Sequence, residues 1–403
     1  MEPRFHRKVL KNGMTVVLEK RDLPVVSVAF AVRNGGINEA MEEKGISHFI
    51  EHLLYKGTEK RNAKQIAEEI ERNGGELNGF TSEEITAYWC KMPSRHLDVA
   101  LDVLGDIVRN PKFDEKEIEK ERKVIFEEIK LYHDNPIKHV FTEIQKCLYG
   151  DSLSIDIIGT HETMNSLKKE NIVKKFEEVY KPNQMILCVV GDADFEKLVK
   201  FAEDNFPDPG VKGRVPEQKI SLKNEAAIEE RTGIDQANLV FAYHVPVAGE
   251  KGSHVAQVLS EVLVGGFSSR LFNEIREKRN LAYGVKGGAA INKRFAYNYV
   301  YVGTMKENVE EVKEIILKET EKVASDLDEK ELNDVKEQMI GQHQISMENS
   351  QDQMVELLVS ELHGNAKDFY EFEKKIRAVK LEDVKAFAKE AVKKYSFFAL
   401  VPK

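Results

Sequence analysis

The sequence predicts an α+β protein built as two domains that share one order of strands and helices. Three observations support this prediction. A chain of 403 residues is too long for one ordinary hydrophobic core. The second half restarts the order of strand and helix patterns found in the first half. A stretch rich in proline and glycine at 206–214 separates the halves, because both residue types interrupt regular structure. We therefore expect one domain at 1–210 and a second at 211–403.

The elements of the first half follow from turn residues and hydrophobic period. Asn-Gly at 12–13, flanked by apolar residues, predicts a β-hairpin over 9–18, and the apolar run 25–32 predicts a further strand. Apolar residues three and four apart mark helices, and short runs of β-branched and aromatic residues mark strands. These patterns predict, in order, a helix at 63–73, a strand at 85–90, helices at 94–108 and 114–133, and a buried strand at 185–190.

The second half predicts a similar series. Its patterns give a strand at 238–244, a helix at 253–264, a Gly-Gly followed by further helix, a strand at 297–302, and long amphipathic helices to the end. The likeness to the first half lies in the order of elements more than in residue identities. It indicates an ancient duplication of one module.

Composition excludes several classes of protein. The net charge of −9 argues against a dedicated nucleic-acid binder, and no basic stripe with interleaved aromatic residues is present. No apolar run is long enough to span a bilayer, and residues 1–6 lack the apolar core of a signal peptide. The three cysteines have no paired spacing, which favours reduced thiols. We expect a cytoplasmic protein that binds neither nucleic acid nor membranes.

The helix expected near 45–57 carries two histidines and a glutamate in the order His48-x-x-Glu51-His52, which is the inverzincin order. At about 100° per residue, His48 and His52 lie roughly 40° apart around the helix axis. The rest of the helix is apolar on nearly every side, which predicts that it is buried: Phe49, Ile50, Leu53 and Leu54. Buried imidazoles and a carboxylate need partners, and a metal ion supplies one.

A third ligand is expected from the helix at 114–133. Its apolar stripe runs through four residues, Ile118, Ile125, Ile129 and Tyr132. By the same helical count Glu121 and Glu128 fall inside this stripe, whereas Glu127 falls outside it. A carboxylate on a core-facing stripe is costly unless a cation or hydrogen-bond donors meet it. Glu128 is therefore a better ligand candidate than Glu127, and Glu121 is a candidate to orient an imidazole.

The sequence resembles the pitrilysin family of zinc peptidases, at the half-length module size of its members that are similar to the mitochondrial processing peptidase. Four motifs in order carry the resemblance: His48-Phe49-Ile50-Glu51-His52, Gly74-Gly75-Glu76-Leu77-Asn78, Glu128 with its helix, and Arg276 followed by Tyr283. The resemblance covers essentially the whole chain. It implies two homologous α/β domains, each a mostly antiparallel sheet packed with helices. The C-terminal domain would be the inactive copy, because its corresponding helix around 254–258 lacks the second histidine.

The resemblance implies one Zn²⁺ per chain, bound by His48, His52 and Glu128 with a position left for water. Glu51 would be the general base that takes a proton from that water and later gives one to the leaving amine. Arg276 and Tyr283 are similar to the pair that grips the substrate carbonyl and stabilises its oxyanion.

The family also implies how a peptide substrate lies. Residues 78–82 would form an exposed strand edge on which an extended peptide adds as a further strand. The substrate-binding residues of this strand are expected to be Asn78, Gly79, Phe80 and Thr81. Gly79 stands where many relatives carry alanine. Tyr55 aligns with an aromatic residue that borders the pocket for the residue after the cleaved bond, although a core role is equally compatible with its position.

The implied function is a zinc endopeptidase that hydrolyses short or unfolded peptides inside a chamber formed by two chains. Because the zinc site and the Arg276–Tyr283 pair belong to different domains, the partner would be a second copy or a sister subunit. Processing of a specific presequence is a variant. The short loop at 264–269 argues against a role as the presequence-handling partner subunit. The alternatives are a non-catalytic core subunit of the same fold and a binding module with a structural metal. The presence of Glu51 beside all three ligands argues against both.

Overall fold

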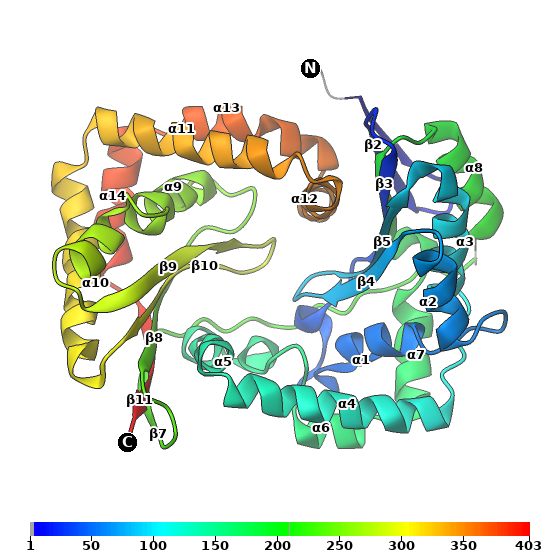
Figure 1. Cartoon of the computed structure of the whole chain (residues 1–403), viewed down its shortest axis with the longest axis horizontal. Helices are drawn as coiled ribbons and strands as arrows, with labels where there is room; N and C mark the ends of the chain where they lie inside the picture. Colours follow the sequence, from blue (N-terminus) through cyan, green and yellow to red (C-terminus); the bar gives the residue numbers. More distant parts are fainter. Residues whose placement is uncertain (1–3, 209) are drawn as a thin grey trace. The chain divides into compact units, whose positions relative to one another are not determined.

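The protein is described here by a computed structural model that covers residues 4–208 and 210–403 (Figure 1). The chain forms two compact units, and each contains one sheet. The first unit comprises the described residues up to Ile129 together with Asp156–Lys219 and Ser346–Phe369. The second comprises Lys130–Ile155, Ile220–Ile345 and Tyr370–Lys403. A single boundary after residue 210 does not express this interleaving.

The sheet of the first unit has six strands and is mostly antiparallel. Only the neighbours β2 and β6 run parallel; every other described pair is antiparallel. In order across the sheet the strands are β1 (Phe5–Val9), β2 (Thr15–Lys20), β6 (Met185–Gly191), β3 (Val25–Val32), β5 (Thr86–Pro93) and β4 (Glu76–Thr81). β4 therefore lies at an edge, with β5 as its neighbour.

The sheet of the second unit repeats this order without a counterpart of β1. Its first and last strands are again parallel neighbours, and its other described pairs are antiparallel. Across the sheet the strands are β7 (Ala226–Arg231), β11 (Ser396–Pro402), β8 (Ala237–His244), β10 (Ala296–Thr304) and β9 (Ala282–Ile291). If β1 is left out and the remaining five strands of each sheet are numbered along the chain, both sheets read first, fifth, second, fourth, third from one edge to the other. The prediction of two related mostly antiparallel sheets packed with helices is confirmed.

Strand β3 shows why the central strands are apolar throughout. Side chains alternate between the faces of a strand. On one face of β3, Val28 and Phe30 join the core of the first unit, and on the other Ser27 bonds to Ser350 Oγ at 2.9 Å. Because both faces are covered, the strand lacks the apolar–polar alternation of a half-exposed strand.

Helices cover both faces of the first sheet. The helices on the face to which Val28 points include α1, which contacts β4 and β5, and α3, which contacts β3 and β5. Helix α12 covers the opposite face at β3 and β6. The helices of this unit are α1 (Ile46–Leu54), α2 (Ala63–Glu71), α3 (Leu97–Ile107), α4 (Glu115–Asp134), α6 (His161–Ser166), α7 (Lys169–Val179), α8 (Phe195–Asn205) and α12 (Ser350–His363). The boundary between the units falls inside α4.

The second unit is covered in the same way. α5 packs on β8 and β11, the counterparts of the strands that α12 covers in the first unit, and α9 contacts β9 and β10. Its helices are α5 (Pro136–Leu148), α9 (Ser253–Val264), the π-helix η6 (Phe272–Glu277), α10 (Val309–Asp326), α11 (Glu329–Ser346), α13 (Phe372–Arg377) and α14 (Leu381–Ala391). Each half of the chain thus supplies one helix to the sheet of the other half, which is why the units interleave.

Three further predictions concern the linker, the cysteines and membranes. The predicted linker at 206–214 includes residue 209, which lies outside the described residues; on its C-terminal side Gly213 donates its N–H to Asn183 Oδ1 at 2.7 Å. The three cysteines are free and buried. Within the described ranges, no helix combines the length and the apolar composition that crossing a membrane requires.

Candidate metal centre

Helix α1 begins at a glycine and a buried carboxylate. Gly45 precedes the helix with φ +96°, and a Cβ there would lie 2.9 Å from the backbone N and Cα of Gly159, so glycine is favoured. The Glu39 carboxylate accepts the N–H groups of Gly45 at 2.9 Å and Ser47 at 2.7 Å. A carboxylate at a helix N-terminus satisfies free donors and complements the helix dipole. Glu39 therefore fixes where α1 starts.

The three predicted ligands come together. Nε2 of His48 lies 3.6 Å from Glu128 Oε2, and Nε2 of His52 lies 3.8 Å from the same oxygen. One ligand atom from each residue lies within 4.8 Å of the others. His48 is buried, whereas His52 and Glu128 are half-buried, so these atoms converge at a partly exposed point between α1 and α4.

This geometry fits a zinc ion. In a tetrahedral site with metal–ligand distances of about 2.0–2.2 Å, ligand atoms lie roughly 3.3–3.6 Å apart. The two distances to Glu128 Oε2 are close to this range. Burial, with a smaller contribution from His52, lowers the pKa of His48 to about 3, so the imidazole is neutral, as a ligand must be. Two imidazoles and one carboxylate are a donor set that zinc commonly binds.

The helical count on α4 separates the carboxylates as predicted. Glu127 is exposed, Glu128 is half-buried, and Glu121 is 6% exposed. Glu121 Oε2 lies 3.2 Å from Nδ1 of His52, and Lys56 Nζ lies 2.8 Å from Glu121 Oε1. Burial raises the pKa of Glu121, but the contacts with His52 and Lys56 outweigh it and the pKa is lowered. An ionised Glu121 thus orients His52 with Nε2 toward the ligand cluster.

Glu51 lies on α1 between the two histidines and is 9% exposed. Its Oε2 accepts a hydrogen bond of 2.6 Å from Thr81 Oγ1. Burial raises the pKa of Glu51, and the hydrogen bond from Thr81 opposes this shift. A carboxylate with a raised pKa beside a metal site has the properties of a general base or acid.

Edge strand β4 borders Glu51. Alternation along the strand places Gly79 and Thr81 on one face and Asn78 and Phe80 on the other. The first face meets α1, because Thr81 bonds to Glu51. Asn78 is exposed, and Phe80 is half-buried. β4 pairs with β5 along one edge only. Its opposite edge has backbone N–H and C=O groups that pair with no described strand of the sheet, as a peptide-binding strand requires.

Tyr55 follows α1 directly and lies next to this strand. The ring is half-buried and packs against Tyr88 with ring centroids 5.8 Å apart. Its hydroxyl oxygen is buried. The structure therefore gives Tyr55 part of the core role that the sequence left open.

Arg276 and Tyr283 belong to the second unit and lie together within it. The guanidinium lies 4.9 Å from the centroid of the Tyr283 ring and donates a 2.6 Å hydrogen bond to the Tyr283 carbonyl oxygen. Tyr283 is 84% exposed. A stacked cation on an exposed tyrosine presents two hydrogen-bond donors side by side.

Sequence reasoning missed two contributions to the site. Glu39 lies six residues before Gly45 in an irregular segment, so no helical or strand period indicates its role. Thr81 was expected to bind substrate, and its hydrogen bond to Glu51 has no signature in the sequence. The pairing of Lys56 with Glu121 could have been found from the sequence. Lys56 lies one helical turn after His52, and Glu121 faces His52.

Family models match most of the chain. The model described as Insulinase (Peptidase family M16) matches residues 15–161, and the one described as Peptidase M16 inactive domain matches residues 166–339. The first match contains all three candidate ligands and Glu51.

Similar proteins span the whole chain. An uncharacterized zinc protease of Bacillus subtilis, YmxG, is 32% identical over 388 residues, which cover 95% of each chain. An uncharacterized zinc protease of Mycobacterium leprae is 30% identical and covers 98% of this chain and 91% of its own. A protease from Helicobacter pylori shares the fold with a TM-score of 0.91 at 24% identity, over 99% of this chain and 100% of its own. A chain of Complex III2 from Candida albicans has a TM-score of 0.85 at 17% identity, over 98% and 95%.

Proposed function

Because the chain belongs to peptidase family M16, the insulinase family, we propose that it is a zinc-dependent endopeptidase that hydrolyses short or unfolded peptides. The observation that carries the proposal is the convergence of His48, His52 and Glu128 with Glu51 beside them. Three protein ligands leave a zinc site open for reaction, and a structural site usually has four.

The residues of the first unit divide the chemical work. His48, His52 and Glu128 would hold one Zn²⁺, and Glu121 keeps His52 in the orientation that binding needs. A bound zinc ion supplies Lewis acidity toward water and the scissile carbonyl. Glu51 accepts the proton of the attacking water on one oxygen and delivers a proton to the leaving nitrogen. Thr81 holds the other oxygen of Glu51 throughout.

Substrate would bind as an added strand. The edge of β4 offers backbone donors and acceptors to an extended peptide, so recognition depends little on the substrate's side chains. Asn78 to Thr81 would line this strand. Arg276 and Tyr283 would donate hydrogen bonds to the carbonyl next to the cleaved bond and stabilise its developing negative charge.

We further propose a chamber formed by two chains. The ligand cluster belongs to the first unit and the Arg276–Tyr283 pair to the second. By the resemblance to half-length members of the family, a dimer would bring the two together. The partner would be a second copy or a related subunit. The cytoplasm is the proposed compartment, and the three free cysteines agree with reducing conditions.

The alternative is a non-catalytic subunit of the same fold. The likeness to a chain of Complex III2, at 17% identity, shows the fold alone and does not favour either role. The presence of all three candidate ligands and of Glu51 supports the peptidase instead.

A comparison of three single substitutions tests the proposal. Glu51→Gln should reduce peptide cleavage by about 1,000-fold or more, because the base is lost, while zinc stays near one per chain. Glu128→Gln should lose the metal. Glu127→Gln, on the exposed neighbour, should keep both zinc and activity. The zinc content is measured by atomic emission. Cleavage is measured with a mixture of unstructured peptides as substrates. Full activity in the Glu51→Gln protein would exclude this mechanism.

A further inference from the structure

A small space on the face of β4 that meets α1 is bordered by Tyr55 and Glu51. Residue 79 is glycine there. A Cβ built on Gly79 lies 2.6 Å from the Tyr55 hydroxyl oxygen, 3.0 Å from Glu51 Oε1 and 3.0 Å from the Ala87 carbonyl oxygen. Non-bonded carbon atoms attract best at about 3.5–4.0 Å, so 2.6 Å is a severe overlap. The space above Gly79 thus has no room for a side chain while the tyrosine hydroxyl is present.

The Tyr55 ring has little freedom to move away from this space. Tyr55 is the C-cap residue of α1, and its ring packs against Tyr88. The Tyr88 hydroxyl shares a 2.6 Å hydrogen bond with the Tyr180 hydroxyl, and both rings are buried. Because packed interiors transmit strain, crowding above residue 79 is relieved by displacing Glu51 or β4 rather than the ring.

The two oxygens of Glu51 are therefore constrained differently. Oε2 accepts the hydrogen bond from Thr81 at 2.6 Å, whereas Oε1 borders the same space as the Tyr55 hydroxyl. That hydroxyl is buried and accepts or donates no hydrogen bond within the described part of the chain. A buried hydroxyl without a partner is unfavourable, so its presence beside the candidate base points to a role at the site.

We propose that Tyr55 and Gly79 form a size-matched pair that positions Glu51 for proton transfer, an inference that rests on the proposed peptidase function. Thr81 fixes one carboxylate oxygen by a hydrogen bond. The Tyr55 hydroxyl fills the space into which the other oxygen would otherwise swing, and the missing side chain at residue 79 makes room for that hydroxyl. Both members are positioning residues that act through Glu51.

Four proteins test the pair: wild type, Tyr55→Phe, Gly79→Ala and the double variant. Misplacing a catalytic group by about 1 Å costs roughly 100-fold in rate, so Gly79→Ala should lower kcat by about 30- to 100-fold with little change in KM. Tyr55→Phe removes the severe 2.6 Å overlap of the new methyl group with the hydroxyl and leaves the two milder contacts at 3.0 Å. The double variant should therefore recover kcat to within about threefold of Tyr55→Phe. Zinc should stay near one per chain in all four.

Gly341→Ala is the matched control, because a Cβ at Gly341 meets nothing within 4 Å and the residue lies on helix α11 of the second unit. It should keep the wild-type kcat. A Gly79→Ala protein with wild-type kcat, or a double variant as slow as Gly79→Ala, would overturn the pair.

A second measurement separates this inference from the proposed function. If the zinc-loaded wild type cleaves no peptide, the peptidase assignment fails and the pair is judged on thermal unfolding alone. Gly79→Ala should then lower Tm, and adding Tyr55→Phe should restore most of the loss. Strictly additive changes in Tm would refute the pair, and non-additive recovery would support it.

Discussion

Glu83 is a buried carboxylate that makes the stability of the first unit depend on pH. The Lys44 ammonium, itself fully buried, lies 3.5 Å from Glu83 Oε2. Burial nevertheless raises the pKa of Glu83 to about 7, with attraction to Lys44 opposing the shift. The folded state thus favours the neutral acid, whereas the unfolded chain has a pKa near 4.5. The contribution of Glu83 to the free energy of unfolding is therefore fully present below about pH 4.5 and is lost as the pH rises through about 7.

The predicted consequence concerns Glu83→Gln, in which an amide imitates the neutral acid. At pH 8 the variant should be more stable than the wild type by on the order of 3 kcal/mol, and below pH 4.5 the two should be equally stable. Urea unfolding between pH 4.5 and 8 measures this difference. Trp89 is the single tryptophan of the chain and is 7% exposed in β5, so its fluorescence reports the first unit. A constant difference at every pH would contradict the assignment.

Individual residues show how far the sequence could define the site. The helical count distinguished Glu128 from Glu127, and placed Glu121 toward His52, because each carboxylate's direction follows from a regular period. The contacts of Thr81 with Glu51, and of Glu39 with the start of α1, join an irregular or edge segment to a helix. Their positions depend on how separate elements pack, and no local pattern encodes that.

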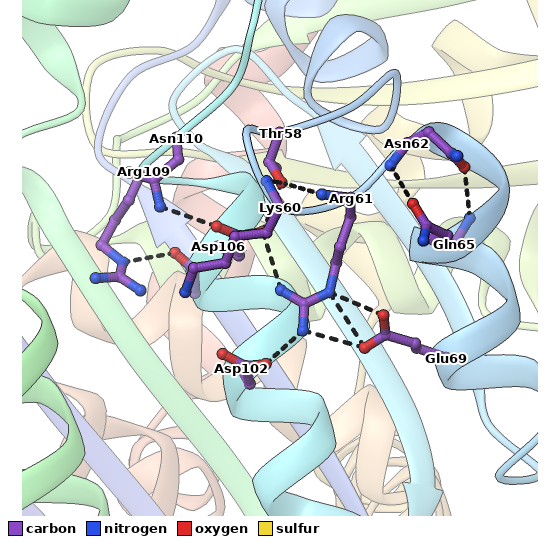
Figure 2. Close-up of polar contacts among 11 residues, drawn as sticks. Thr58, Lys60, Arg61, Asn62, Gln65, Glu69, Asp102, Asp106, Arg109 and Asn110 are labelled. Atoms are coloured by element: carbon purple, nitrogen blue, oxygen red, sulfur yellow. Dashed lines mark hydrogen bonds and ion pairs between the residues drawn. The ribbon is translucent and has the colours of Figure 1, made fainter.

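At the scale of elements, the segment between α1 and α2 is held by Arg61 (Figure 2). Its guanidinium contacts Glu69 of α2 at 3.1 Å, Asp106 of α3 at 2.9 Å, and Asp102. The Thr58 hydroxyl also donates to Asp106, at 2.6 Å, and accepts the Arg61 N–H at 3.0 Å. Asp106 is fully buried. This network ties the residues that follow the metal-site helix to the next two helices.

Replacement of Arg61 by alanine should therefore cost much stability. Removing one partner of a buried ion pair leaves the other charge uncompensated, which costs about 3–5 kcal/mol. Lys64→Ala, in the first turn of α2, is the control, since its pair with Glu68 is exposed, 82% and 53%, and should contribute less than about 0.5 kcal/mol. Trp89 fluorescence in urea measures both. Equal stability of the two variants would show that the network does not hold the segment.

Sequence patterns located most elements because their periods are local. The strand expected at 25–32 and the helix expected at 253–264 have the observed bounds, Val25–Val32 and Ser253–Val264. The patterns did not show that α5 and α12 are exchanged between the halves. An amphipathic helix shows which of its faces is apolar, but the sheet on which that face packs depends on long-range contacts.

At the scale of the whole molecule, the exchanged helix α12 is anchored by one carboxylate. Glu361 has a side chain that is 1% exposed, and it accepts from Arg7 of β1 at 2.7 Å and from Arg33 at 2.9 Å. It also accepts the N–H of Ala366 at 3.0 Å. These contacts join the beginning of the chain to a segment more than 300 positions later, within one compact unit.

Loss of this anchor should loosen the first unit. Glu361→Ala removes charge-assisted hydrogen bonds and leaves Arg7 and Arg33 without this carboxylate, so we expect about 2–3 kcal/mol less stability by Trp89 fluorescence. Glu203→Ala is the control within the first unit, because its pair with Lys8 is about half exposed on both sides and should contribute at most about 0.5 kcal/mol. A Glu361→Ala protein as stable as this control would argue that the Glu361 carboxylate does not anchor α12.

The exchange of helices also has a consequence for synthesis on the ribosome. The last strand of the first sheet ends at Gly191, and α12 begins at Ser350. At ~5–20 residues per second, translation needs roughly 8 to 30 seconds to reach α12 after β6 is complete. During that time the face of β3 and β6 that α12 covers stays open in the nascent chain. A chain built this way completes the unit that carries the candidate metal centre only when nearly all of its polypeptide has been made.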